Sequence, residues 1–341
     1  MNLADFDYEL PKSFIAQTPV EPRDASRLLV LNRQTGEIWH RRFSEIGEFL
    51  RAGDVLVFND TRVIPARLAA RKAGGGQVEV LLLRRRAPLT WEVLVGGKNI
   101  HPGAVLHIEG ESGLQAVILE ELDGPRRVVQ FSKPITPLLD RVGHTPLPPY
   151  IHTPLADPNR YQTVYATVPG SAAAPTAGLH FTPELIKRLE EQGVIGAFIT
   201  LHVGLDTFRP VGETRIEDHQ MHGEWYEVNE AAARTISQAK LEGRRVIAVG
   251  TTAVRALESA AARGSEHRPV PPGSDITRLY IYPGYQFRVV DAMITNFHLP
   301  KSTLLMLVSA FAGRERILAT YEVAKREGYR FYSFGDAMLI I

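Results

Sequence analysis

The fold is decided by residues 246–259, which have the sequence Val-Ile-Ala-Val-Gly-Thr-Thr-Ala-Val-Arg-Ala-Leu-Glu-Ser. Four apolar residues in a row are typical of a strand that is buried on both faces, as in a parallel sheet. The strand ends at Gly250, and the threonines that follow can cap a helix. Such a unit can hold a nucleoside or a carboxylate at the carboxyl end of the strand. A purely structural turn explains these residues equally well, and they lack the Gly-x-Gly-x-x-Gly pattern of dinucleotide sites.

The same alternation of strands and helices extends to both sides of this unit. Apolar runs predict strands at 54–58, 194–203, 245–249, 277–282, 289–297 and 329–334. Helical spacing predicts helices that start after Thr182 and that cover 230–242, 252–263, 302–312 and 314–327. Repeated strand–helix units imply a mostly parallel sheet with helices on its faces. We therefore predict an α/β main domain.

Residues 61–149 differ in composition from the chain on either side. Short runs rich in valine and leucine alternate with glycine-containing turns, as in a small all-β domain. These runs are 78–83, 91–95, 104–108 and 127–131. Pro148 and Pro149 then form a stiff, extended return segment. We predict that an all-β, barrel-like domain at 61–149 is inserted into a discontinuous α/β catalytic domain, formed by 1–60 and 150–341.

The overall composition indicates a folded protein of two domains. The chain has 341 residues, of which 44% are hydrophobic and 23% charged, as in average globular proteins. Its net charge of +1 neither favours nor excludes a nucleic-acid partner, so any RNA contact must come from local patches. The lack of cysteine excludes disulfides, cysteine-ligated zinc and thiol catalysis. The sequence has no long apolar run and no signal segment, and we expect a cytoplasmic protein without membrane contact.

Residues 170–182 combine small residues with the start of an expected helix. Loops of this kind let a ligand approach the backbone closely, and the helix start offers N–H groups to negative charge. By composition alone, a tight packing loop is a slightly better interpretation. No Gly-Lys-Ser/Thr follows, which excludes a Walker phosphate loop.

Two other segments carry histidine at the end of an expected strand. Segment 200–210 contains His202 and Asp206, and segment 291–303 contains Asn296 and His298. Ligands of open α/β sheets bind outside the carboxyl ends of the strands. A lone histidine there is more often merely hydrogen-bonded, but the acid and the arginine near His202 favour a functional site. Ser302 is expected only to cap the next helix, and no Gly-x-Ser-x-Gly elbow supports a hydrolase.

His219 and His222 are spaced so that two imidazoles could share one face of a helical turn. A metal site there would lack the His-Glu-x-x-His pattern and would need a distant third ligand. Because imidazole is equally suited to proton transfer, we predict no metal site.

Arginines gather in and next to the inserted block. A charge run is usually a solvated face, but arginine clusters also bind RNA phosphates. The candidate RNA contacts are Arg62, Arg67, Arg84, Arg85 and Arg86.

Taken together, these segments resemble the S-adenosylmethionine:tRNA ribosyltransferase-isomerase family of the queuosine pathway. The resemblance also includes residues 57–67, 146–150 and 161–166, and it spans roughly 5–336. It implies that the ribosyl group of S-adenosylmethionine is moved to 7-aminomethyl-7-deazaguanine at the wobble position of tRNA and rearranged to give epoxyqueuosine. Adenine and methionine leave. S-adenosylmethionine is then a consumed co-substrate, with no further cofactor, and we expect a monomer.

That implied chemistry needs a general base for the proton on ribose C5′ and a general acid for the departing adenine. The candidates for proton transfer are His180, His202, Asp206, His219, His222, Asp291 and His298. The candidates for substrate binding are Gly178, Phe181, Gly250, Thr251, Thr252, Arg255, Asn296 and Phe297. An S-adenosylmethionine-dependent RNA methyltransferase, a non-catalytic RNA-binding protein and, third, a metal-dependent hydrolase are the alternatives.

Overall fold

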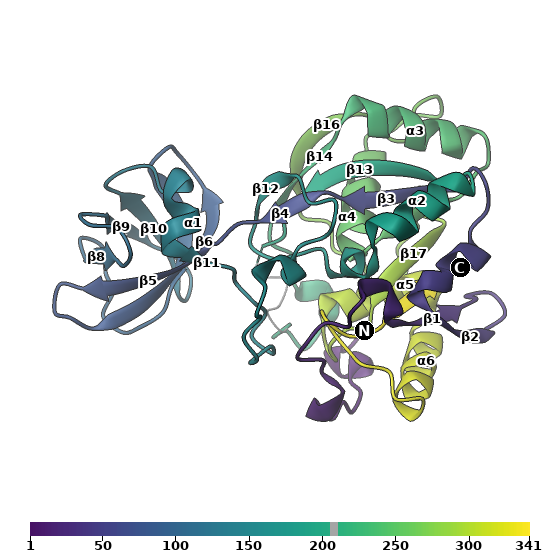
Figure 1. Ribbon diagram of the computed structural model, residues 1–341, viewed down its shortest axis with the longest axis horizontal. Helices are drawn as coiled ribbons and strands as arrows, with labels where there is room; N and C mark the ends of the chain where they lie inside the picture. Colours follow the sequence, from purple (N-terminus) through teal and green to yellow (C-terminus); the bar gives the residue numbers. More distant parts are fainter. Residues whose placement is uncertain (205–210) are drawn as a thin grey trace. The chain divides into compact units, whose positions relative to one another are not determined.

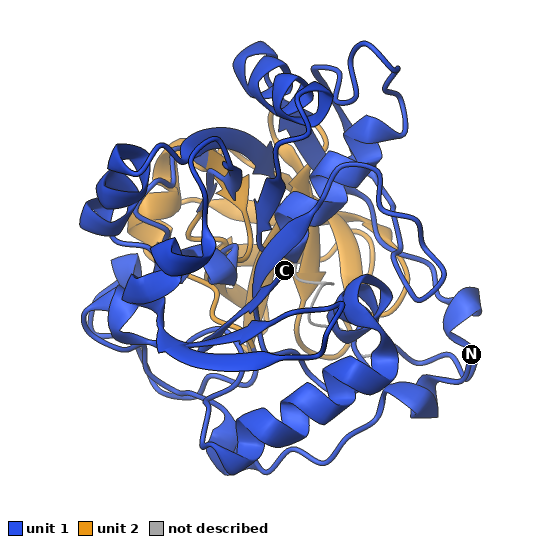
Figure 2. Ribbon diagram, turned by 90° about the vertical axis from the view of Figure 1, so that its right-hand side faces the viewer, with its two compact units in different colours: residues 1–62, 149–168, 174–341 blue, residues 63–148, 169–173 orange. Residues whose placement is uncertain are grey.

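The computed structural model describes residues 1–204 and 211–341, which form two compact units (Figure 2). The larger unit comprises 1–62, 149–168 and 174–341, and the smaller unit comprises 63–148 and 169–173. The short segment 169–173 thus belongs to the smaller unit, whereas the predicted boundaries placed it in the α/β domain. Within the described residues, no helix is both long and apolar enough to cross a membrane.

The larger unit is built on a nine-stranded sheet (Figure 1). Its strands, in spatial order, are β16 (Gly273–Thr277), β14 (Glu224–Val228), β13 (Ile195–Leu201), β3 (Val55–Asn59), β15 (Val246–Val249), β17 (Ala292–Asn296), β18 (Ala337–Ile340), β1 (Arg27–Leu31) and β2 (Ile38–Arg42). The four central strands β13, β3, β15 and β17 run parallel. Antiparallel pairs occur on both sides of this centre, so the sheet is mixed rather than mostly parallel. Strand β2 is one example. The link from β1 to β2 is too short for the crossover that a parallel pair needs, so the two strands are antiparallel.

Helices cover both faces of this sheet, as predicted for an α/β fold. On one face, α2 (Pro183–Glu191) packs into a core cluster that contains Leu56 and Phe58 of β3. Side chains alternate between the faces of a strand. Helices α3 (Glu230–Leu241) and α4 (Thr251–Ala261) contact β3, β13 and β15 but contribute nothing to this cluster, so they cover the other face.

Helix starts were predicted correctly where a capping side chain marks them. The Thr182 hydroxyl accepts the N–H of Leu185 at 3.1 Å and begins α2. Ser302 likewise accepts the N–H of Leu305 at 3.2 Å and begins α5 (Thr303–Ala312). Helix α6 (Arg314–Arg326) follows.

Three predictions of local structure were wrong. Residues 329–334 do not form the last strand, which is β18. The Asp336 carboxylate accepts the N–H groups of Arg27 (3.0 Å) and Arg330 (2.8 Å) and closes a turn there, so the aromatic residues before it fill the core from a loop. Residues 277–282 were expected to form a strand, but the strand in this region, β16, covers Gly273–Thr277 and ends where the expected one begins. Residues 224–228 form strand β14, so the segment after His219 is not helical.

The smaller unit is a closed, six-stranded antiparallel barrel, which confirms the predicted all-β insertion. Its strands, in order around the barrel, are β5 (Arg67–Lys72), β6 (Gln77–Arg85), β7 (Thr90–Val95), β10 (Arg126–Phe131), β9 (Gln115–Glu121) and β8 (Val105–Ile108). A pairing of β8 with β5 closes the barrel, and β11 (Gly143–His144) lies beside β5. Closure leaves no long unpaired strand edge. A separate two-stranded sheet pairs β4 (Thr61–Val63) with β12 (Val168–Ser171).

Glu258 of α4 anchors the segment that leads into β17. Its side chain is fully buried, and its oxygens accept the N–H groups of Arg288 (2.9 Å), Val289 (3.1 Å) and Val290 (3.1 Å). The Tyr285 hydroxyl donates to the same carboxylate at 3.2 Å. One acidic side chain thus fixes four donors and sets the start of β17.

We predict that Glu258→Gln lowers the free energy of unfolding by about 1–3 kcal/mol, because the new NH2 group would face N–H donors in a buried site. Urea denaturation measures this change. Glu190→Gln, on the exposed side of α2, is the control and should change stability by less than about 0.5 kcal/mol. Equal stability of both variants would contradict the anchoring role.

Candidate active site

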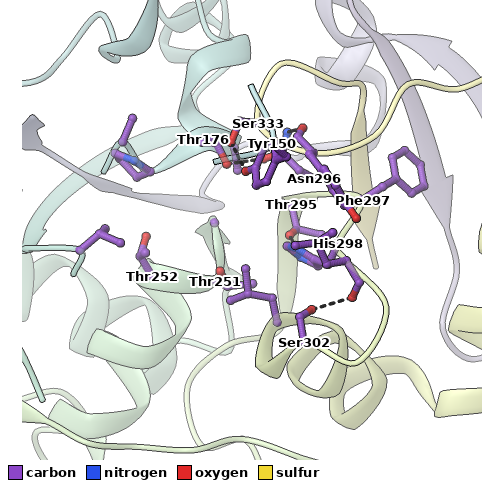
Figure 3. A pocket seen from close by; sticks show the side chains of 18 residues that line it. Tyr150, Thr176, Thr251, Thr252, Thr295, Asn296, Phe297, His298, Ser302 and Ser333 are labelled. Carbon is purple, nitrogen blue, oxygen red and sulfur yellow. Dashed lines mark hydrogen bonds between the residues drawn. The ribbon is translucent and has the colours of Figure 1, made fainter. Parts of the chain in front are cut away.

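A pocket lies in the larger unit at the carboxyl ends of β15 and β17 (Figure 3). Its empty space amounts to about 680 Å³, including the part open to solvent. The wall comes from separate stretches of chain: Tyr150, Ala174, Pro175, Thr176, Ala177, Val203, Gly250, Thr251, Thr252, Thr295, Asn296, Phe297, His298, Leu299, Ser302, Leu304, Tyr332 and Ser333. Parts of four of the five predicted segments therefore meet in one hollow.

Asn296, the last residue of β17, is held in one orientation. Its Nδ2 donates to the carbonyl of Tyr332 at 3.2 Å, and this carbonyl can only accept. The same Nδ2 donates to His180 Nε2 at 3.1 Å, while the Thr176 hydroxyl donates to Oδ1 at 3.0 Å. Because Nε2 accepts, His180 must carry its proton on Nδ1, which donates to the Ser26 hydroxyl at 2.8 Å. His180 therefore supports the pocket wall from behind.

His298 lies in the pocket wall itself. Its Nε2 is 2.7 Å from the Thr295 hydroxyl, and its Nδ1 forms no hydrogen bond with any other described residue. The backbone is fixed as well: the N–H of His298 is bonded to the Tyr321 hydroxyl at 3.0 Å, and its carbonyl accepts from the Tyr8 hydroxyl. Figure 3 shows the imidazole beside Thr295, above the start of α5. One ring nitrogen thus remains available to a ligand.

Burial keeps the imidazoles near the strand ends neutral. It lowers the pKa of His298, which is 7% exposed, to about 3. Burial also lowers the pKa of His180 to about 3, with the positive charges of Arg330 and Arg23 acting in the same direction. Burial lowers the pKa of His202 to about 4. At neutral pH each ring therefore has one N–H donor and one acceptor.

Hydroxyl groups make up most of the remaining polar surface of the pocket. The Tyr150 and Ser333 hydroxyls are 2.7 Å apart, and burial raises the pKa of Tyr150 and of Tyr332 above the ordinary tyrosine range. The Thr252 hydroxyl is buried and has no hydrogen-bond partner among the described residues. Such an orphaned group is costly unless a ligand supplies the partner. Tyr150, Tyr332 and Ser333 were not predicted as site residues; residues 146–150 were noted only as part of the family resemblance, and residues 329–334 only as a strand.

His202 does not line the pocket, although its neighbour Val203 does. Its Nδ1 is 2.8 Å from the Thr61 hydroxyl, and its ring stacks on Trp225 at a centroid distance of 5.0 Å. Asp206, predicted beside it, lies outside the described residues.

The other predicted proton-transfer residues also lie outside the pocket. Asp291 precedes β17 and lies at the amino ends of β15 and β17, away from the pocket. There it pairs with Lys240 at 2.8 Å and accepts the N–H of Val246 at 2.8 Å. His219 pairs with Glu213 at 2.9 Å. His219 and His222 belong to an extended loop and not to a helical turn, so their spacing does not place them on one face. Among the residues that the structure describes, no group of three potential ligands could hold a metal ion.

The predicted substrate-binding residues divide into two groups. Gly250, Thr251, Thr252, Asn296 and Phe297 line the pocket. The ring of Phe297 points away from it (Figure 3) and packs on Phe331 at 4.9 Å, so only the backbone of Phe297 faces the hollow.

Gly178, Phe181 and Arg255 do not line the pocket. A Cβ on Gly178 would lie 2.0 Å from the Tyr165 hydroxyl, so this glycine is required for packing. Phe181 is a core residue, with ring contacts to Phe43 and Phe58. Arg255 is buried, with ion-pairing to Glu224 and a 3.0 Å bond to the carbonyl of Leu279.

Three of the five arginines predicted to bind RNA are paired with acids of the barrel. Arg84 (3.2 Å) and Arg86 (3.1 Å) both contact the buried carboxylate of Glu92, as does Arg126. Burial alone would raise the pKa of Glu92, but hydrogen bonds from Arg126 and Arg86 hold it below its ordinary value. Arg67 pairs with the exposed Glu79 at 3.3 Å. Arg85 and Arg62 are exposed. Internal pairing thus offsets part of this positive charge.

The chain is similar over its whole length to proteins of known name. A family model described as queuosine biosynthesis protein matches residues 3–340. The protein named S-adenosylmethionine:tRNA ribosyltransferase-isomerase from Moorella thermoacetica is 58% identical over 347 aligned positions, and its namesake from Desulfitobacterium hafniense is 55% identical over 345. Each alignment covers 100% of this chain and 100% of the relative.

A solved structure agrees with these relatives. The crystal structure of S-adenosylmethionine tRNA ribosyltransferase from Thermotoga maritima has 41% sequence identity and a TM-score of 0.57. The match covers 99% of this chain and 100% of that chain. The similarity therefore includes both compact units.

We predict that acid destabilises the larger unit through its buried histidines. An unfolded histidine has a pKa of about 6.5, whereas burial lowers the folded values for His180 and His298 to about 3. The unfolded state therefore binds more protons, and stability is lost as the pH falls below about 6.5, on the order of 1 kcal/mol per pH unit for each histidine.

Denaturation at pH 7, 6, 5 and 4.5 measures this dependence. In His180→Gln, the slope of unfolding free energy against pH should decrease by the contribution of one histidine, on the order of 1 kcal/mol per pH unit. Replacement of the exposed His152 by Gln is the control and should leave the slope unchanged. A slope in His180→Gln equal to that of the wild type would show that His180 can accept a proton in the folded protein.

Proposed function

This chain belongs to the queuosine biosynthesis protein family, and we propose that it has the activity for which its relatives are named, transfer of a ribosyl group from S-adenosylmethionine to tRNA with isomerisation of that group. S-adenosylmethionine is consumed in this reaction as a substrate. The acceptor implied by the family is 7-aminomethyl-7-deazaguanine at the wobble position, and the product is epoxyqueuosine. The names of the relatives favour neither a methyltransferase nor a non-catalytic RNA-binding protein. Because tRNA is the acceptor, we place the enzyme in the cytoplasm.

The observation that supports this proposal best is the orphaned Thr252 hydroxyl in the pocket at the strand ends. The threonines expected to cap α4 are instead its first helical residues, Thr251 and Thr252, and the N-cap is Gly250, which has no side chain that could cap the helix. The first N–H groups of α4 therefore lack a capping side chain, and they suit a carboxylate or a ribose oxygen. We assign this end of the pocket to the methionine carboxylate or the ribose of S-adenosylmethionine.

We assign proton transfer to His298. It is the histidine that lines the pocket within the described chain, and its Nδ1 has no other partner there. The Thr295 hydroxyl at Nε2 can either donate or accept, so the ring can hold either tautomer. With the proton on Nε2, Nδ1 accepts a proton from the substrate. The imidazolium so formed then donates this proton from Nδ1 to the departing base, which restores the neutral ring.

Other predicted catalytic residues receive different roles. His180 has both nitrogens engaged and does not line the pocket, so we treat it as a positioning residue for Asn296. We remove Asp291 and His219 from the catalytic set because Asp291 pairs with Lys240 and His219 is hydrogen-bonded to Glu213, both outside the pocket. His202 and His222 do not line it either.

The two compact units suggest a division of labour. We propose that the larger unit is the catalytic domain, because the whole pocket belongs to it. The barrel carries Arg84, Arg85 and Arg86, which we propose to contact RNA. Arg85 carries the least compensated charge of the three, since its only side-chain bond within the described chain is to the carbonyl of Ala87 at 3.3 Å.

The proposed function is tested by incubating the protein with S-adenosylmethionine and tRNA that carries 7-aminomethyl-7-deazaguanine. We expect one adenine released for each tRNA modified, with methionine as the second product. Chromatography of the reaction and mass analysis of the nucleoside give both results. A nucleoside that gains only a methyl group, with no adenine released, would show a methyltransferase instead.

We predict that His298→Ala lowers kcat at least about 100-fold, which is the usual effect of losing a general acid or base. His219→Ala is the matched control, and it should stay within about twofold of the wild type. Because burial lowers the pKa of His298 to about 3, the wild-type rate should show no inflection near pH 6.5. Near-native turnover by His298→Ala would mean that another group moves the proton.

A further inference from the structure

A second hollow lies in the larger unit along the far half of α4. It is bordered by β16 and by the segment 278–288, and it has no lining residue in common with the pocket at the strand ends. Its empty space is about 1110 Å³, including open solvent. We call this hollow the arginine groove, because Arg263, Arg278 and Arg288 line it.

The arginine groove holds positive charge that the protein does not neutralise. All three arginines are exposed. Arg263 lies 3.6 Å from Asp275, but the side chains of Arg278 and Arg288 form no hydrogen bond or ion pair with a described residue. The other lining acid, Glu258, is buried and directed at backbone donors. Two guanidinium groups are therefore free to meet an anion.

Aromatic rings line the same groove. Tyr285 and Phe287 are partly exposed, with ring centroids 5.1 Å apart in an edge-on arrangement, whereas the lining residue Tyr226 is buried. A neighbouring hollow shares residues 285–288 with the groove and adds Arg33 together with the Lys240–Asp291 ion pair. Guanidinium groups combined with partly exposed rings suit single-stranded nucleic acid, because bases stack on aromatic faces while phosphates pair with arginine.

The groove is already shaped in the free protein. The Glu258 carboxylate holds Tyr285 and the backbone of Arg288, so the segment that carries both ring and charge is fixed before any ligand binds. Helix α4 links this groove to the pocket: Thr251 lines the pocket, Glu258 lines the groove, and Arg263 lines it just beyond the helix end. The seven residues from Thr251 to Glu258 span about 10 Å of helix, which is within reach of the nucleotides next to a base bound in the pocket.

We propose that the arginine groove binds the tRNA strand on one side of the acceptor nucleotide, through phosphates at Arg278 and Arg288 and base stacking on the aromatic rings. This proposal rests on the proposed function for the identity of the RNA. It assigns RNA contact to the catalytic unit in addition to the barrel.

The test is the double variant Arg278→Gln/Arg288→Gln, with steady-state kinetics and with binding of unmodified tRNA followed by fluorescence anisotropy. We expect the KM for tRNA and its Kd to rise about tenfold or more, while kcat and the KM for S-adenosylmethionine stay within about twofold. The slope of log affinity against log salt should decrease by about 1.4, or about 0.7 for each phosphate that the variant no longer neutralises.

Two further variants separate a specific groove from a general charge effect. Arg234→Gln removes an arginine of α3 whose side chain is 74% exposed, and it should leave tRNA binding unchanged. Arg278→Lys/Arg288→Lys keeps the charge and should retain most of the salt slope. Thermal unfolding of every variant shows whether the fold is intact.

The proposal is overturned if the double glutamine variant is folded and binds tRNA with the wild-type Kd and salt slope. It is also overturned if Arg234→Gln weakens binding to the same extent. Failure of the proposed function gives a different result, since the wild type would then release no adenine. Anisotropy still tests the groove in that case, because it measures RNA binding without turnover.

Discussion

The parallel pairing of β15 and β17 is the constraint on which the site depends. The two strands pair in one register, with Val249 opposite Ile294, and the N–H of Gly250 donates to the carbonyl of Ile294 at 2.8 Å. Because the strands are parallel and in this register, β15 and β17 end side by side, and the segments that follow them begin next to each other. The turn at Gly250 and the end of β17 at Asn296 become neighbours, although about 45 residues separate them in the sequence. A slip in this register would separate the first turn of α4 from His298.

Desolvation determines how the polar groups at this edge can act. The buried imidazoles are neutral, so each offers one donor and one acceptor with a direction that its partners set. For His180 both atoms are used, and the ring serves to fix Asn296. For His298 one atom is left to the pocket. The same residue type in similar burial thus has both ring nitrogens engaged in one place and one nitrogen left for the proposed proton transfer in the other.

Positive charge is treated differently in the two compact units. In the barrel, Arg84, Arg86 and Arg126 surround one buried carboxylate, which offsets part of their charge and holds them in place. In the larger unit, Arg278 and Arg288 have no such partner among the described residues, while the nearby acid Glu258 is engaged by backbone donors. Clustering in the sequence is therefore a poor guide to free charge, because a buried acid from another strand can pair with the cluster.

The sequence by itself determined the strand–turn–helix unit at 246–259, the helix starts at Thr182 and Ser302, the all-β insertion and the family resemblance, because periodicity, capping and motif order are local properties of a chain. Tertiary structure alone decided which polar residues share a cavity. Asp291 and His298 lie in one short predicted segment, yet Asp291 precedes β17 and His298 follows it, so the two residues lie at opposite ends of this strand. Tyr150 and Ser333 reach the pocket although no local pattern predicted a site role for either residue, and the aromatic run at 329–334 fills the core from a loop. These outcomes depend on strand direction, register and burial, which are set by contacts between residues far apart in the chain.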